Sequence, residues 1–166
     1  MSADNQQERL KFTGWVVGFI DGEGCFSVSI YKSPNTKLGW QVFPEFAVTQ
    51  GEKSLGSLRK IKDFFGCGNL FVNRRCDNHK ENLYRYCVRS LKDLKEKIIP
   101  FFVENPLQTA KRTDFEIFVQ IMKMIEVDAH LTMNGIKEIA KLTEAMNRKK
   151  PAKILASSET VRQDLK

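Results

Sequence analysis

The sequence has no long hydrophobic run and no recognisable leader segment. A helix needs about 20 consecutive apolar residues to cross a bilayer, and no stretch of the 166 residues has that character. The opening segment MSADNQQE is polar and acidic, unlike a secretory signal or an Arg-rich transit peptide. We therefore expect an intracellular protein with no targeting signal and no membrane partner.

Cysteines are few and poorly arranged for metal binding. The sequence has four, of which Cys76 stands in a Cys-x-x-His spacing with His79. No second close ligand pair accompanies this one, and Cys25 and Cys87 fall inside predicted strands. The pattern favours reduced thiols over structural zinc or a disulfide framework.

Acidic residues are outnumbered by basic ones. The chain has 27 Lys and Arg against 20 Asp and Glu, a formal net charge of +7. A basic surface attracts polyanions, so nucleic acid is the partner that the charge favours. The length suits one domain over residues 1–166, in which we expect 1–6 and about 148–166 to be peripheral or flexible.

Hydrophobic periodicity predicts an α+β domain. The expected order is helix, two strands, helix, two strands and then helices. The helices are expected at about 7–21, 55–65, 113–127 and 133–147, with a further one opening at Ser90, and the strands at 25–31, 40–50, 69–75 and 83–89. The four strands should form an antiparallel sheet with one face covered by helices.

Local signals mark several helix ends. Ser54 is expected to cap the second helix, which should end at Gly66-Cys67-Gly68. Thr113-Asp114-Phe115-Glu116 predicts a capping box. Pro100 is expected to interrupt or end the helix in which it lies.

Two acidic residues stand where the first helix is predicted to end. The segment WVVGFIDGEG, residues 15–24, contains Asp21 and Glu23 directly after apolar residues. The C-terminal end of a helix carries partial negative charge, which disfavours acids there. We expect a cation to compensate, and a divalent metal ion is the economical candidate. Gly22 and Gly24 are expected to allow a sharp exit from the helix.

Residues 16–24, VVGFIDGEG, resemble the nine-residue signature of the LAGLIDADG homing endonucleases. Weaker resemblances follow at AVTQ (47–50), GCGN (66–69) and SETVR (158–162). The resemblance implies an αββαββα saddle whose sheet lies in the major groove of double-stranded DNA. Because one motif copy is found, it also implies a homodimer, with the first helices packed together at Gly14 and Gly18 and with Asp21 serving helix exit and dimer geometry.

The activity that the resemblance implies is intron homing. It predicts a site-specific double-strand DNA endonuclease that hydrolyses phosphodiester bonds with Mg2+ at a long pseudo-palindromic site, with Ca2+ substituting without supporting cleavage. The enzyme should occur wherever its host intron resides, in an organelle or a prokaryotic cytoplasm. Two alternatives stay open, an RNA-binding intron maturase and a catalytically silent DNA-binding regulator, although the acid at Glu23 favours the nuclease.

The resemblance also assigns roles within the catalytic site. Glu23 should coordinate the metal ion, with the Gly22 carbonyl as a second ligand. Gln50 is expected to position the attacking water, and Lys111 to stabilise charge on the phosphate or lower the pKa of that water. Lys53 is a candidate for a further basic group, while Ser54 and Arg112 occupy the alternative positions for the two lysines.

Strand alternation predicts which side chains face the DNA. Phe26, Val28 and Ile30 should face the core on the first strand, and Tyr84, Tyr86 and Val88 on the fourth. Arg suits guanine, and Asn or Gln suits adenine, in the major groove. The candidate contacts are Ser27, Ser29, Tyr31, Ser33, Gln41, Asn73, Arg75, Arg85, Cys87 and Arg89. Phosphate contacts are expected from the loop and tail residues Lys37, Lys80, Lys149, Lys150 and Lys153.

Overall fold

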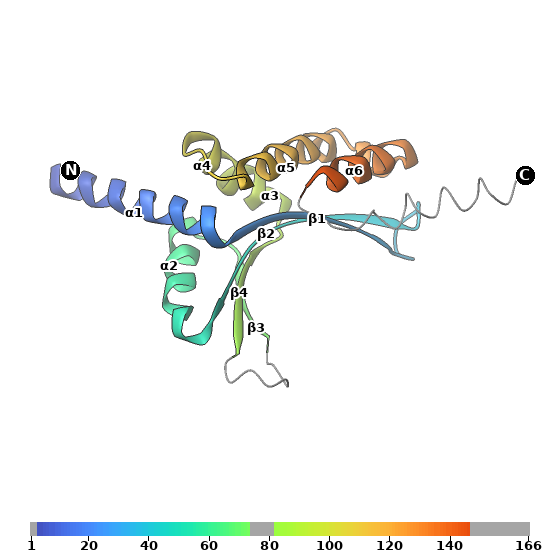
Figure 1. Ribbon diagram of the computed structural model, residues 1–166. Helices are drawn as coiled ribbons and strands as arrows, with labels where there is room; N and C mark the ends of the chain where they lie inside the picture. Colours follow the sequence, from blue (N-terminus) through green and yellow to red (C-terminus); the bar gives the residue numbers. More distant parts are fainter. Residues whose placement is uncertain (1–2, 74–81, 147–166) are drawn as a thin grey trace, which may run out of the picture. The chain divides into compact units, whose positions relative to one another are not determined.

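The computed structural model describes residues 3–73 and 82–146, and its element order confirms the predicted α+β class (Figure 1). The main elements are α1 (Ala3–Glu23), β1 (Gly24–Lys32), β2 (Trp40–Gly51), α2 (Leu55–Phe65), β3 (Asn69–Asn73), β4 (Leu83–Val88), α3 (Leu91–Asp93), α4 (Ile99–Glu104), α5 (Lys111–Glu126) and α6 (Met133–Ala145). Three short turns of helix join them: η1 (Glu52–Ser54), η2 (Leu94–Ile98) and η3 (Ala129–Leu131). No helix among these is both long enough and apolar enough to cross a membrane.

The four strands form the expected antiparallel sheet. Their order is β1-β2-β4-β3. Phe46 of β2 pairs with Val88 of β4, and Asn69 of β3 pairs with Cys87, so β4 is bonded on both sides. An interior strand is fixed by two ladders, and its alternate side chains therefore have defined neighbours on each face.

The described residues divide into two compact units. The first unit holds those within 1–25 and 45–112, and the second those within 26–44 and 113–166. β1, β2 and α5 each contribute residues to both units. That residues 1–166 form one domain stays a prediction.

The core of the first unit is aromatic. The ring centroid of Phe46 lies 6.0 Å from that of Phe65, 6.2 Å from that of Tyr86 and 5.9 Å from that of Phe102. α2 is amphipathic, and it runs alongside β3 and β4 with Leu58 and Ile61 fully buried (Figure 1).

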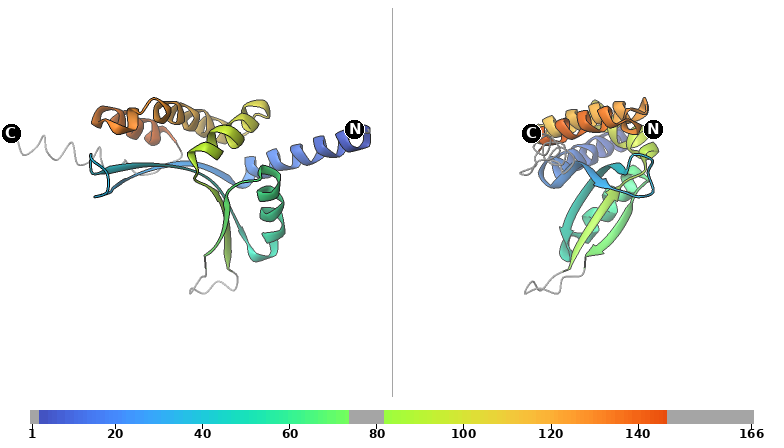
Figure 2. Two further views of the ribbon diagram at one scale, coloured as in Figure 1. Left: turned by 180° about the vertical axis from the view of Figure 1, so that it is seen from behind. Right: turned by 90° about the vertical axis from the view of Figure 1, so that its right-hand side faces the viewer.

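In the second unit α6 covers the hairpin of β1 and β2. Ile136 and Ala140 of α6 are fully buried, and they pack against the hairpin residues Ile30, Leu38, Trp40 and Val42. Phe26 meets Phe115 of α5 at a centroid distance of 5.0 Å. α5 and α6 lie side by side over the hairpin (Figure 2).

The end of α1 differs from the prediction. The helix continues through Glu23, and β1 begins at the next residue, so both Gly22 and Glu23 belong to its last turn. A Cβ on Gly24 would come 2.6 Å from Ile20 Cγ2 and 2.7 Å from Ile20 O, whereas one on Gly22 would meet nothing within 4 Å. Gly24 alone is therefore required for the tight exit, and the expectation for Gly22 is wrong.

Two predicted caps are also wrong. α5 begins at Lys111, so Thr113 lies inside the helix instead of opening it. Ser54 is at the N-cap position of α2 but makes no capping hydrogen bond. Its φ of −102° and ψ of 9° lie outside the extended region that a capping side chain needs.

Other helix ends lie where the sequence predicts them. The Ser90 hydroxyl accepts a 3.2 Å hydrogen bond from the Asp93 N–H at the start of α3. Gly66 ends α2 in the left-handed region, at a φ of 57°. Pro100 does not end its helix, but the regular α-helix is interrupted as expected, because the wider π turn η2 directly precedes α4, in whose first turn Pro100 lies.

Candidate functional site

Asp21 ties the end of α1 to the loop before α5. Its carboxylate accepts hydrogen bonds from the Gln108 N–H at 2.9 Å and from the Thr109 hydroxyl at 2.6 Å. Burial by itself would raise the pKa of Asp21, but these hydrogen bonds and the nearby Lys111 ammonium lower it below the ordinary value. Asp21 therefore acts as an ionised anchor between two segments of the first unit.

Lys111 neutralises part of the negative helix end. The last turn of α1 holds no basic residue. The Nζ of Lys111 instead donates a 3.0 Å hydrogen bond to the carbonyl of Ile20, one of the last four carbonyls that a helix leaves without intrahelical partners. The expected cation at this helix end is thus supplied in part by the chain itself.

Glu23 has a different environment from Asp21. Successive helical residues are rotated by about 100°, so the two side chains point in different directions. Glu23 is exposed, and within residues 3–73 and 82–146 its carboxylate has no hydrogen bond or ion pair. An unpartnered acid at the negative end of a helix is a suitable ligand for a cation.

One chain supplies only part of a metal site. No group of three or more His, Cys, Asp or Glu that could hold a metal is found among the described residues. Glu23 and the Gly22 carbonyl offer hard oxygen ligands, which suit Mg2+. Both residues are exposed at the end of α1, so further ligands can approach from outside the chain.

The other predicted catalytic residues are more dispersed. Gln50 is half-buried near the end of β2, opposite Tyr84 of β4. Lys53 is exposed in η1, and Arg112 is exposed in the first turn of α5. Since Glu23 has no partner in the described residues, neither Gln50 nor Lys53 contacts it.

Arg85 and Arg89 share one acidic partner. Arg85 Nη2 is bonded to Glu45 Oε1, and Arg89 Nε lies 2.5 Å from Glu45 Oε2. Glu45 is only 7% exposed, and its hydrogen bond with Arg89, together with its charge, raises the pKa of Arg89. The two arginines predicted to contact DNA are therefore held by a nearly buried carboxylate.

Cys87 is not exposed, contrary to the prediction. It is 2% exposed, and so is Ala47, its partner on β2. The charges of Arg85 and Arg89 act on the Cys87 thiol, so both guanidinium groups lie near it. Burial, and next the Glu45 charge, raise the pKa of the thiol above its ordinary value, while the arginines oppose the shift.

The candidates on the hairpin are only partly accessible. Ser27, Ser29 and Gln41 are half-buried, and Tyr31 is exposed beside Phe43. Ser33 is 8% exposed because it closes the turn, donating its N–H to Gly39 O at 2.9 Å. The expectation that Ser33 stands on the open face is therefore wrong.

Several candidates fall outside the described residues: Arg75, Cys76, His79, Lys80, Lys149, Lys150, Lys153 and the segment 158–162. Asn73 ends β3, but its side chain is not among those described. Lys37 is exposed in the hairpin loop.

Comparison with known proteins identifies the family. The family model for LAGLIDADG endonucleases matches residues 16–122. The chain belongs to the LAGLIDADG endonuclease family. The match covers α1 from Val16 onward, the sheet and α5 as far as Met122.

Individual members of the LAGLIDADG family are similar to this chain in sequence and in structure. A probable intron-encoded endonuclease 3 of Neurospora crassa is 33% identical over 141 residues, which are 83% of this chain and 25% of that protein, so the chain spans only a part of that relative's length. The crystal structure of the homing endonuclease I-TnaI is similar with a TM-score of 0.77 and 36% identity, covering 90% of this chain and 97% of that one. I-SmaMI, bound to an uncleaved DNA target in the presence of calcium ions, has a TM-score of 0.78 and 32% identity, covering 87% and 48% respectively.

The LAGLIDADG helix has a buried face and an open face. Val16 and Ile20 are fully buried four residues apart. Gly14 and Gly18, also four apart, are exposed, and a Cβ at either would meet nothing within 4 Å. The glycine pair is thus accessible on the side away from the chain's own core.

Three residues that contact the candidate site residues had no role assigned from the sequence: Thr109, Glu45 and Phe71. Thr109 and Glu45 act on residues far away in the sequence, and no local pattern announces such contacts. Phe71 is 46% exposed on β3 and lies beneath the Arg89 guanidinium, 5.2 Å from its ring centroid. Alternation along β2 was the one available signal, since it places Glu45 on the face of Ala47.

Proposed function

We propose that this LAGLIDADG protein is a metal-dependent, site-specific double-strand DNA endonuclease of the intron-homing type. The observation that carries the proposal is the contrast at the end of α1. Asp21 and Lys111 are engaged in fixing the helix end, whereas Glu23 is exposed and has no partner among the described residues. Metal-dependent phosphodiester hydrolysis needs an open carboxylate on a fixed backbone, and the anchored end of α1 provides one at Glu23.

Glu23 and the Gly22 carbonyl would hold Mg2+. The bound ion would supply charge stabilisation for the attacking and leaving oxygens of an in-line displacement. Gln50 orients the attacking water, and Lys111 and Lys53 stabilise negative charge on the phosphate. The calcium-containing complex of I-SmaMI with an uncleaved target supports a cation site at which Ca2+ does not promote cleavage.

The active form is a homodimer in this proposal. One chain offers a single Glu23 and no complete ligand set in its described residues. Two copies joined through the open face at Gly14 and Gly18 bring two such carboxylates to one DNA duplex. A two-fold symmetric protein reads a site with matching symmetry, which predicts a long pseudo-palindromic target.

DNA cleavage selection tests this function. Wild-type protein is incubated with a randomised duplex library in Mg2+, and the cleaved ends are sequenced. Glu23→Gln should bind the selected sequence with unchanged affinity but cleave it at least about 1,000-fold more slowly, because it removes the metal ligand and leaves the sheet intact.

The controls separate the three candidate classes. Ca2+ in place of Mg2+ should preserve binding and stop cleavage. Glu52→Gln neutralises another exposed acid in the same unit and should retain cleavage. Full activity of Glu23→Gln would contradict the metal assignment. Specific binding without cleavage by the wild type indicates a silent regulator, and preference for intron RNA indicates a maturase.

A further inference from the structure

One nearly buried acid holds two half-exposed arginines on the sheet. Glu45 is 7% exposed, whereas the side chains of Arg85 and Arg89 are 43% and 46% exposed. Each arginine binds a different oxygen of the Glu45 carboxylate. The three residues are called the Glu45 cluster below.

The Glu45 cluster lies beside two small residues. Arg85 lies on β4 and Arg89 directly follows its last residue, four positions further on, with Cys87 midway between them. The charges of both arginines act on the Cys87 thiol, and Cys87 and Ala47 are each 2% exposed.

Glu45 is the group that permits the two arginines to converge. Two guanidinium groups close together repel each other, and a carboxylate between them reverses the sign of the interaction. The nearly buried Glu45 needs both partners in turn, because a buried carboxylate without them is strongly disfavoured. Removing Glu45 should therefore release both arginines.

Arg89 is oriented by two contacts and Arg85 by one. Arg89 Nε donates a hydrogen bond to Glu45, and Arg89 Cζ lies 5.2 Å from the centroid of the Phe71 ring. Arg85 is held at Nη2, and its Nε is buried without a hydrogen-bond partner among the described residues. A guanidinium that is oriented before binding loses less conformational entropy on meeting its target.

We propose that Glu45 is a specificity-determining residue that positions Arg85 and Arg89 as a pair for guanine in the major groove. The proposal rests on the proposed function, which makes the sheet the DNA-contact surface. Without Glu45 the same arginines would reach phosphates of any sequence, because phosphate contacts need charge but no fixed geometry. Glu45 also removes one unit of positive charge from this face, which weakens sequence-independent binding.

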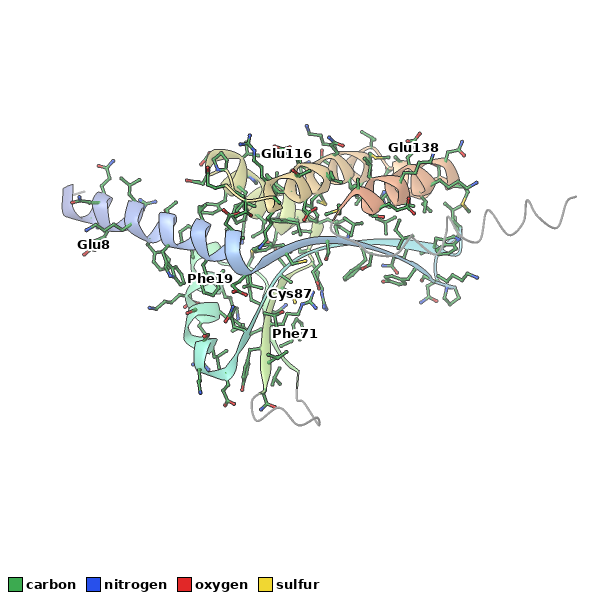
Figure 3. The ribbon with its side chains drawn as sticks, viewed as in Figure 1. Glu8, Phe19, Phe71, Cys87, Glu116 and Glu138 are labelled. Carbon is green, nitrogen blue, oxygen red and sulfur yellow. The ribbon has the colours of Figure 1, made fainter. Side chains whose placement is uncertain are left out.

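The first test compares three acid substitutions on DNA. Glu45→Gln removes the charge at constant size, Glu45→Asp keeps the charge but shortens the reach, and Glu138→Gln neutralises an exposed acid on α6 (Figure 3). Binding is measured on a duplex selected by the wild-type protein from a random library, on its single-base variants and on an unrelated duplex, at several salt concentrations.

Each variant has a distinct expected result. Glu45→Gln should lose about tenfold discrimination at the guanine positions while binding the unrelated duplex more tightly. Glu45→Asp should lose discrimination without that gain, since its charge is unchanged. Glu138→Gln should keep full discrimination. Wild-type discrimination in both Glu45 variants would overturn the proposal.

Two arginine variants show which idea has failed. Arg85→Ala and Arg89→Ala should each relax preference at one symmetry-related pair of positions. If they do so while both Glu45 variants discriminate normally, only the role of Glu45 is wrong. If neither arginine variant changes preference, Arg85 and Arg89 do not read the site and the Glu45 proposal falls. The endonuclease function is decided separately, by cleavage with wild type and Glu23→Gln.

A second test needs no DNA. The alkylation rate of Cys87 is measured by mass spectrometry in the full chain, with the exposed Cys25 as an internal reference. Glu45→Gln should raise the rate at Cys87 at least about fivefold relative to Cys25, because the two arginines beside the thiol separate, whereas Glu138→Gln should not. Equal protection of Cys87 in Glu45→Gln and wild type would overturn the positioning role.

Discussion

Asp21 and Glu23 are two residues apart and perform different tasks. The Asp21 carboxylate accepts hydrogen bonds from Gln108 and Thr109 in the loop before α5. The Glu23 carboxylate is exposed at the helix end and has no partner among the described residues. The rotation of the helix between them explains the division, because only one of the two directions faces the chain's own loop. Asp21 is therefore engaged in the fold, and Glu23 stays open for the metal-binding role that we propose.

Asp21→Asn should lower stability in a pH-dependent way. The folded pKa of Asp21 lies below its ordinary value of 3.8, so its stabilisation is complete above that value and disappears as pH falls through the folded pKa. We expect the substitution to lower the free energy of unfolding by about 1 kcal/mol at pH 7, reduced by its partial exposure. Urea unfolding from pH 7 down to pH 3 measures the difference, which should shrink below about pH 4.

Glu23→Gln is the matched control for stability. It neutralises the unpartnered acid of the same turn, and relief at the negative helix end should leave stability unchanged or slightly higher. Equal losses of stability in Asp21→Asn and Glu23→Gln would show that general charge, and not the Asp21 anchor, is responsible.

At the scale of elements, the Thr109 hydroxyl helps to link the end of α1 to the loop before α5. Thr109 Oγ1 donates to Asp21 and also accepts a 3.2 Å hydrogen bond from the Lys111 N–H. It thus fixes the start of α5, whereas Thr113 lies inside the helix. The position of Lys111, and with it the hydrogen bond to Ile20, follows from this start.

Thr109→Val and Thr113→Val should separate the two candidate caps. Valine keeps the shape of threonine but removes the hydroxyl, so Thr109→Val should cost about 1 kcal/mol of unfolding free energy and slow cleavage through a misplaced Lys111. Thr113→Val should stay within about 0.5 kcal/mol of wild type. Chemical denaturation measures both, and Thr109→Ser should restore the loss. A larger loss at Thr113 would mean that the capping box operates after all.

The turn from α2 into β3 contains two glycines with unequal constraints. Gly66 has a φ of 57°, and a Cβ added there would meet nothing within 4 Å, whereas Gly68 has a φ of 75° and would place a Cβ 2.7 Å from Cys87 O. Gly66→Ala should therefore cost about 1 kcal/mol from the left-handed backbone alone. Gly68→Ala should cost clearly more, because β3 must also move away from β4. Thermal unfolding compares the two, and equal melting temperatures would contradict the close approach.

At the scale of the whole molecule, the open face of α1 determines assembly in our proposal. Gly18→Leu should give monomers in sedimentation experiments and reduce DNA affinity at least about tenfold, because a bulky side chain keeps the two helices apart. Gly56→Leu is the control, since Gly56 is also an exposed helical glycine with nothing within 4 Å of its Cβ position. A wild-type chain that stays monomeric both free and on DNA would remove the symmetric mechanism.

The sequence alone determined the family and the order of elements. The motif at residues 16–24 and the strand alternation are local patterns, and local patterns follow from helical and strand geometry. The helix end at Gly66 and the cap at Ser90 were predictable for the same reason, because each depends on residues within a few positions.

Only the tertiary structure decided how the site is held together. Thr109 meets Asp21 across 88 positions, Lys111 meets Ile20 across 91, and Glu45 meets Arg85 across 40. No short-range pattern encodes such contacts, because they exist only after the sheet has paired and the loop before α5 has packed against α1. The same packing buried Cys87 and moved the start of α5 away from Thr113, since the energy of a long-range partner outweighs a local capping preference.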